Sequence, residues 1–377
     1  LIADIAKDLV QVSGEHWTLL RWLQRLPDEY VLRRPEIGAA VSWSLLFSRE
    51  LSRARELLGM LDEYCEQQAN QLPPELLRQC RRDVGLNRCF LEAAEDNTVH
   101  ASQLLKEWLA NNPDAEKRDM VTAYILQLYS SVSTFETELG INAAGSAVAV
   151  GEQFTAGFLA AWAQAAAGMS AMQQANLAAA ARHFRKGLEY NSRNASPFSY
   201  VGCLNTVLLA EVCYELNDTA QAEALLAEHF EYIDNQSVVD IAYTGYRVMA
   251  KLQFAHENLE AGLKLIRLGK ESAARADLSR LSAMLAALEI RSLLLAGKDT
   301  EAQQLANESG FNEPEGALPL QRASPMVREL HKEIKAELYL SKKLPKHAIP
   351  LLDSLVASAE ETARQRRLVD VLLLRAR

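Results

Sequence analysis

The chain has 377 residues and a net charge of −9, and it is 49% hydrophobic and 24% charged. This composition excludes a disordered or collagen-like chain. The negative charge argues against a nucleic-acid-binding surface in the body of the chain, because neutralising phosphates requires clustered Lys and Arg. Only 17 Gly and 11 Pro, with abundant Ala, Leu, Glu, Arg and Gln, favour helix, so we expect an all-α fold.

The cysteines indicate a reducing compartment. There are five, an odd number, and none forms a CxxC pair; they are Cys65, Cys80, Cys89, Cys203 and Cys213. Each lies in a helical pattern, where free cysteine behaves as a small apolar residue. We therefore expect a cytoplasmic protein. The most apolar window, 154–172, is rich in Ala and Gly and predicts a buried helix instead of a membrane span.

Taken in chain order, helical patterns alternate with Pro, Gly and Asn breaks. Pro27 and Pro35 bound a turn after the first helix pair, and Asn111–Asp114 is another strong break. The longest break, 309–325, is rich in Gly and Pro. Helices are expected at 1–12, 15–26, 36–48, 51–67, 74–96, 99–110, 115–131, 134–153, 326–341 and 345–361, and two more between 154 and 192 with a corner at 173–176.

A three-residue key recurs along these helices. It consists of a small residue, a second small residue twelve positions later, and a bulkier apolar residue four positions beyond that. The first positions are spaced by roughly 40 residues, a period typical of helix-pair repeats. The keys that follow this pattern are Ser42/Ala54/Leu58, Cys89/Ala101/Leu105, Gly168/Ala180/Phe184, Ala210/Ala222/Leu226, Ala250/Gly262/Ile266 and Ala336/Ala348/Leu352, and two less typical keys are Ser131/Ala143/Ala147 and Ile290/Ala302/Ala306.

These repeats predict a solenoid, because an antiparallel helix pair cannot bury its apolar stripe alone. The expected fold is a right-handed superhelix of antiparallel helix pairs, similar to tetratricopeptide repeats. We expect one solenoid over 1–377, with an opening pair at 1–34, repeats at 35–308, a loop at 309–325 and truncated last repeats at 326–377. Both ends lie in uncapped helical patterns, which predicts a fragment of a longer protein.

The first sixty residues or so resemble the segment that opens the repeat region of MalT-type, LuxR-like, ATP-dependent transcriptional regulators. The residues that match the pattern of that family, in order, are Gly14, Leu20, Trp22, Leu23, Leu26, Pro27, Leu32, Arg34, Pro35, Trp43, Ala54 and Leu58. The rest of the chain matches the family only in repeat length and helix-pair character.

The resemblance implies that the chain is the effector-sensing part of a transcriptional regulator. In that family the repeats bind a small inducer or a regulatory protein and take part in self-association. ATP binding and DNA binding belong to an N-terminal NTPase module and a C-terminal helix-turn-helix, neither of which is in this sequence. The nearest stretch to a P-loop, Gly140–Ser146, lacks the lysine, so no cofactor is expected here.

Catalytic and metal-binding patterns are missing from the sequence. The seven histidines are scattered without HxxxH or HExxH spacing, and there is no GxSxG motif. We therefore expect neither an enzyme nor a metal site.

The expected ligand-binding residues lie around the keys of the first helices, which line the concave face of such a superhelix. Aromatic and oppositely charged side chains there could hold a polar ligand such as a sugar, small acid or peptide. The alternative is that the aromatics form inter-repeat core and the charges form exposed ion pairs. A generic scaffold that docks a partner protein or peptide is the second functional reading. The nominated residues are Trp162, Glu211, Tyr214, Tyr243, Arg247, Lys251 and Arg291.

Overall fold

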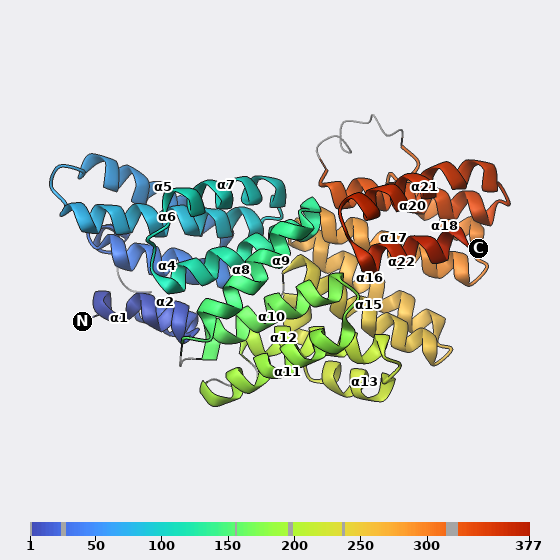
Figure 1. The fold of residues 1–377 in the computed structure, drawn as a ribbon, viewed down its shortest axis with the longest axis horizontal. Helices are drawn as coiled ribbons and strands as arrows, with labels where there is room; N and C mark the ends of the chain where they lie inside the picture. Colours follow the sequence, from blue (N-terminus) through green and yellow to red (C-terminus); the bar gives the residue numbers. More distant parts are fainter. Residues whose placement is uncertain (1, 24–27, 155–156, 195–198, 236–237, 314–322) are drawn as a thin grey trace. The chain divides into compact units, whose positions relative to one another are not determined.

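The computed structural model describes residues 2–23, 28–154, 157–194, 199–235, 238–313 and 323–377, and these ranges contain helices and no strand. The all-α prediction is confirmed (Figure 1). The helices are α1 (Ile2–Lys7), the short π-helix η1 (Asp8–Val12), α2 (His16–Leu23), α3 (Asp28–Leu32), α4 (Pro35–Phe47), α5 (Leu51–Gln67), α6 (Pro74–Ala94), α7 (Thr98–Asn111), α8 (Lys117–Thr134), α9 (Thr137–Gly151), α10 (Gly157–Gln173), α11 (Leu177–Asn194), α12 (Tyr200–Glu215), α13 (Thr219–Ala227), α14 (Phe230–Asn235), α15 (Val239–Ala255), α16 (Leu259–Arg275), α17 (Ser279–Leu295), α18 (Asp299–Glu308), α20 (Pro325–Ser341), α21 (Pro345–Glu361) and α22 (Gln365–Arg375).

Consecutive helices form pairs, and the pairs stack. Helix α4 packs against α5, α6 against α7, α15 against α16, and α20 against α21. The first helix of one pair also packs against the first helix of the next, as α4 does with α6 and α17 with α20. This is the contact pattern expected of a helix-pair repeat.

The chain divides into two compact units. Unit 1 comprises Leu1–Ser131, Leu139–Ala167 and Arg185–Asn205, and unit 2 comprises Val132–Glu138, Gly168–Phe184 and Thr206–Arg377. The single solenoid and its subdivisions at 34, 308 and 325 stay a prediction. Most of the expected 309–325 loop, residues 314–322, lies outside the described residues.

Every position of the eight predicted keys is buried. The small residues are required sterically, as Gly168 illustrates: a Cβ there would lie 2.2 Å from Cε1 of Phe184, which is itself fully buried. Gly262 is equally constrained, because its Cβ would lie 2.1 Å from the ring of Phe254. The keys therefore mark where one helix of a pair lies directly against its partner.

A single left-handed residue forms many of the corners between helices. Ala175, Asn217 and Gly297 have φ values of 57°, 64° and 72°, and Ala175 falls at the predicted corner 173–176. After such a residue, the next N–H donates to a carbonyl five residues back, as Asp218 does to Cys213 at 2.8 Å. This bond satisfies a carbonyl that the helix end would otherwise leave open.

One local expectation needs correction. The segment between Pro27 and Pro35 is not only a turn, because it contains the short helix α3. Residues 230–235 also form a separate helix, α14, before α15 begins. The P-loop-like stretch 140–146 lies inside α9, where Gly140 allows a close approach to Ser131, so this glycine serves helix packing.

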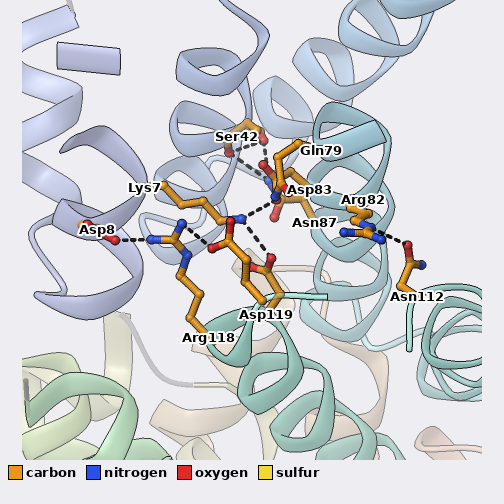
Figure 2. A network of polar contacts seen from close by, with 12 residues as sticks. Lys7, Asp8, Ser42, Gln79, Arg82, Asp83, Asn87, Asn112, Arg118 and Asp119 are labelled. Atoms are coloured by element: carbon orange, nitrogen blue, oxygen red, sulfur yellow. Dashed lines mark hydrogen bonds and ion pairs between the residues drawn. The ribbon is translucent and has the colours of Figure 1, made fainter. Parts of the chain in front are cut away.

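A buried polar network fixes the N-terminal helices of unit 1 to α6 and α8 (Figure 2). The ammonium of Lys7 donates to Asp83 at 2.7 Å and to Asp119 at 2.9 Å, while Asp8 accepts from Arg118. Burial raises the pKa of the Asp83 carboxyl to about 6, against the opposing attraction of Lys7. Removing one partner would leave a buried charge unpaired, so the network fixes the position of α1 even if its net contribution to stability is small.

We predict that Gly168→Ala lowers the free energy of unfolding by about 1–3 kcal/mol, since the added methyl must displace the enclosed Phe184 ring. The control is Gly59→Ala in α5, where an added Cβ meets nothing within 4 Å. That change should stabilise by about 0.5–1 kcal/mol through helix propensity. Urea unfolding of the three proteins measures both effects. Equal effects of the two substitutions would contradict the close helix approach at Gly168.

Candidate functional site

Unit 2 contains a cavity of about 850 Å³. Its walls come from the ends of α8 and α10 and from α12, α15, α17, α20 and α22, together with Arg364 just before α22. Within unit 2, α12, α15, α17 and α20 are the first helices of their pairs. The cavity is therefore lined by the helices that the repeat pattern nominates for ligand binding.

The repeat register determines which side chains line the cavity. The residue that directly follows the first key position is Glu211, Lys251, Arg291 or Glu337 in four successive pairs, and all four line it. Residues four positions earlier lie one helical turn away on the same face. Two of those positions also carry charge and line the cavity, namely Arg247 and Glu333.

The charges on α12, α15 and α22 pair with one another. The carboxylate of Glu211 accepts from Arg247 and lies 2.8 Å from the guanidinium of Arg366. Arg366 also contacts Glu215, at 3.0 Å, although 151 residues separate them in sequence. Helix α22 is thereby tied directly to α12.

A second set of ion pairs connects α17, α20 and α22. Arg291 lies 2.6 Å from Glu333 and 2.7 Å from Glu337, and Arg367 reaches the same Glu333 at 2.9 Å. Arg364 makes a two-pronged contact with Glu329, at 2.7 and 2.9 Å. The basic residues at and just before the start of α22 thus connect α22 to the first helices α12 and α20.

The pKa values follow from burial and from these pairs. Burial alone would raise the pKa of Glu211, but Arg247 and Arg366 more than offset it, so the pKa is lowered. The same balance, with Arg291 and Arg367 as the cations, lowers the pKa of Glu333. Both carboxylates are therefore charged at neutral pH and hold the arginines in fixed positions.

Lys251 lines the cavity without a carboxylate at ion-pair distance in the part of the chain that the structure describes, unlike Arg247, Arg291 and Arg366. Its ammonium lies 5.2 Å from the ring centroid of Tyr214. Burial lowers the pKa of Lys251, and the positive charges of Arg247 and Arg366 lower it further, against the opposing attraction of Glu215 and Glu211. An anionic group of a ligand would give this ammonium a direct partner.

Five of the seven nominated residues line this cavity: Glu211, Tyr243, Arg247, Lys251 and Arg291. Tyr214 is not among the lining residues, and its ring instead lies beside the ammonium of Lys251. Trp162 does not belong to this cavity. It lies in unit 1, stacked on Tyr200 with the ring centroids 5.7 Å apart.

Sequence reasoning missed the basic residues around the start of α22, Arg364, Arg366 and Arg367. The signal was the dense basic run at 364–367, which stands out in a chain with a net charge of −9. Their acidic partners lie on α12 and α20, and nothing in the local sequence identifies those partners.

Within the described ranges, no three potential metal ligands lie close enough together to hold a metal ion. No helix in those ranges is long and apolar enough to cross a bilayer.

Comparison with known proteins gives distant relatives, and no family model matches the chain. The chain is 24% identical over 267 residues to the serine/threonine-protein kinase PknK of Mycobacterium tuberculosis. This match covers 71% of this chain and 24% of the kinase. It is 21% identical over 280 residues to the HTH-type transcriptional regulator AlkS of Ectopseudomonas oleovorans, and 22% over 282 residues to AlkS of Pseudomonas putida. Each AlkS match covers 74% of this chain and 31% of the regulator.

The expected similarity to helix-turn-helix regulators is thus confirmed at a coarse level, over about a third of the length of those relatives. Among solved structures, the Rap conjugation gene regulator of plasmid pLS20, in complex with the Phr* peptide, is similar with a TM-score of 0.52 at 12% identity. The match covers 93% of this chain and 97% of that one. It establishes a shared helical fold.

We predict that Glu211→Gln lowers the free energy of unfolding by about 2 kcal/mol at pH 7, because Arg247 and Arg366 lose their shared counter-charge. The folded-state pKa of Glu211 is lowered. Its contribution is therefore complete above the unfolded value of about 4.3 and disappears as the pH falls through the lower folded value.

The measurement is denaturant unfolding of wild type and variant as a function of pH. The control is Glu223→Gln on the exposed face of α13, which should change stability by less than about 0.5 kcal/mol. A wild-type advantage over Glu211→Gln that is the same at pH 7 and at strongly acidic pH would refute the ion-pair account.

Proposed function

We propose that this chain is the effector-sensing domain of a MalT-type, LuxR-like transcriptional regulator. The unit 2 cavity takes a small effector that carries an anionic group. Binding there alters the contacts of α22 with α12 and α20, and that change passes to parts of the regulator outside this chain. In this proposal the protein is cytoplasmic and not itself an enzyme, and ATP and DNA act through an NTPase module and a helix-turn-helix beyond this sequence.

One observation carries the proposal: a single cavity gathers the inward-facing charges of four successive helix pairs, and no carboxylate of the described residues lies at ion-pair distance from the ammonium of Lys251. A volume of about 850 Å³ is within the range of small-molecule sites. The similarity to AlkS regulators supports a role in transcription, and the motif at the N-terminus supports the MalT-type assignment.

Docking of a peptide or partner protein is the second candidate function. It is favoured by the similar solved structure, a gene regulator in complex with a peptide. The two candidates differ in what should bind: a peptide with a free carboxylate could satisfy Lys251, whereas a generic scaffold would bind a folded partner regardless of that charge.

A thermal-shift screen of sugars, small carboxylic acids and short peptides tests the proposal, because a ligand that binds only the folded state must raise the melting temperature. For a hit that carries a carboxylate, we predict that Lys251→Met weakens binding about tenfold, the loss of one charge-assisted hydrogen bond. Stability should change by less than about 0.5 kcal/mol, since Lys251 has no paired carboxylate. Calorimetry gives the affinities.

The control is Lys264→Met on the exposed face of α16, which should bind the hit as wild type does. Equal affinity of wild type and Lys251→Met would place the ligand elsewhere. A screen without hits, together with capture of a defined protein partner that Lys251→Met still binds, would favour the scaffold function.

A further inference from the structure

Unit 1 contains a cluster of aromatic rings centred on Phe47, at the end of α4. The imidazole of His16 stacks on this phenyl ring with centroids 4.1 Å apart and an interplanar angle of 6°. The rings of Trp43 and Trp162 lie 5.5 and 6.4 Å from it. The other rings within 6 Å of Phe47 are those of Phe90, Phe158 and Tyr200.

The cluster contains polar atoms that the protein leaves unused. Both ring nitrogens of His16, Nε1 of Trp43 and Nε1 of Trp162 are buried and have no hydrogen-bond partner among the described residues. A buried donor or acceptor without a partner costs about 1–3 kcal/mol, and native structures contain few such atoms. Four such atoms on three side chains that surround one phenyl ring need an explanation.

The cluster is not closed off as ordinary core would be. Although His16 and Trp43 are buried, Phe47, Phe90, Trp162 and Tyr200 are only half-buried. The loop before α2 lies against the same cluster, because Gly14, at φ 71°, leaves room where a Cβ would lie 2.6 Å from the Phe158 ring. Half-buried rings beside buried donors suit a bound molecule better than they suit solvent.

In the repeat register, the rings of this cluster occupy the same position in their helix pairs as the charges of the unit 2 cavity do in theirs. Trp43 and Phe90 directly follow the key residues Ser42 and Cys89, just as Glu211 and Lys251 follow theirs. In chain order, the residues that follow the first key position of the eight pairs are Trp43, Phe90, Val132, Met169, Glu211, Lys251, Arg291 and Glu337. It is apolar in the first four pairs and charged in the last four.

The chemistry of the cluster defines the ligand. The indole N–H groups can only donate, so they require acceptor oxygens. Burial lowers the pKa of His16 to about 3, so the imidazole is neutral and offers one donor and one acceptor. A charged ligand would lose its hydration among these uncharged groups without compensation. Stacking on the rings favours a planar aromatic partner.

We propose that the ring cluster around Phe47 is a second binding site, for an uncharged aromatic compound that carries a carbonyl or similar acceptor oxygen. The ligand stacks among the half-buried rings and accepts hydrogen bonds from the indole groups of Trp43 and Trp162. The site uses only residues of unit 1 and does not depend on the effector cavity of unit 2.

The test uses benzamide as the probe, with toluene as a ring without an acceptor and hexanamide as an amide without a ring. Dissociation constants come from ligand-observed NMR titration of the full chain. Benzamide should bind saturably and at least tenfold more tightly than either comparison compound. Trp162→Phe and Trp43→Phe keep an aromatic ring and remove the donor, and each should weaken benzamide binding about fivefold.

Two further variants separate binding from folding. Trp17→Phe, on the exposed face of α2, should bind benzamide as wild type does. Phe47→Leu removes the central ring and should abolish binding while the melting transition stays cooperative. Three results would overturn the proposal: no saturable benzamide binding, which would mean that water alone satisfies the donors, equal affinity for toluene, or unchanged benzamide affinity in both tryptophan variants.

Discussion

The structure depends on how closely the two helices of a pair can approach. At Gly168 the ring of Phe184 occupies the space that any side chain would need, and at Gly262 the ring of Phe254 does the same. This contact fixes the rotation of each helix about its own axis, because only one face is small enough to lie against the partner. Once that rotation is fixed, the side chain of the residue that follows the key must face inward.

The inward-facing positions hold the polar side chains, and in unit 2 burying their charges costs desolvation free energy. Buried ion pairs contribute little net stability, since desolvation of both partners offsets their attraction. Yet Glu211, Arg247 and Arg366 lie together on three different helices, and Arg291 lies between Glu333 and Glu337. An apolar interior would hold these helices at least as well. Charges retained at such positions are better explained by what they orient than by the stability they add.

Sequence periodicity predicted the helix pairs well, including α5 and α21 with their observed bounds, because size constraints at the keys are local in sequence. It also predicted Glu211, Lys251 and Arg291 as inward-facing, since each follows a key. It could not predict that Arg366 meets Glu215, 151 residues away, or that Lys7 bridges to Asp119. Those contacts depend on how several stacked pairs bring distant parts of the chain together.

The same register leaves most positions of the chain free to vary. A key requires only small residues and a bulkier one, as Cys89/Ala101/Leu105 and Ala336/Ala348/Leu352 illustrate, so the other positions of a pair can change while the helices still pack. The residue after the key is free of that size constraint. It can be Trp43 in one pair and Lys251 in another without disturbing the contact beneath it. The side chain at this position can therefore change from one pair to the next while the helix-pair scaffold persists.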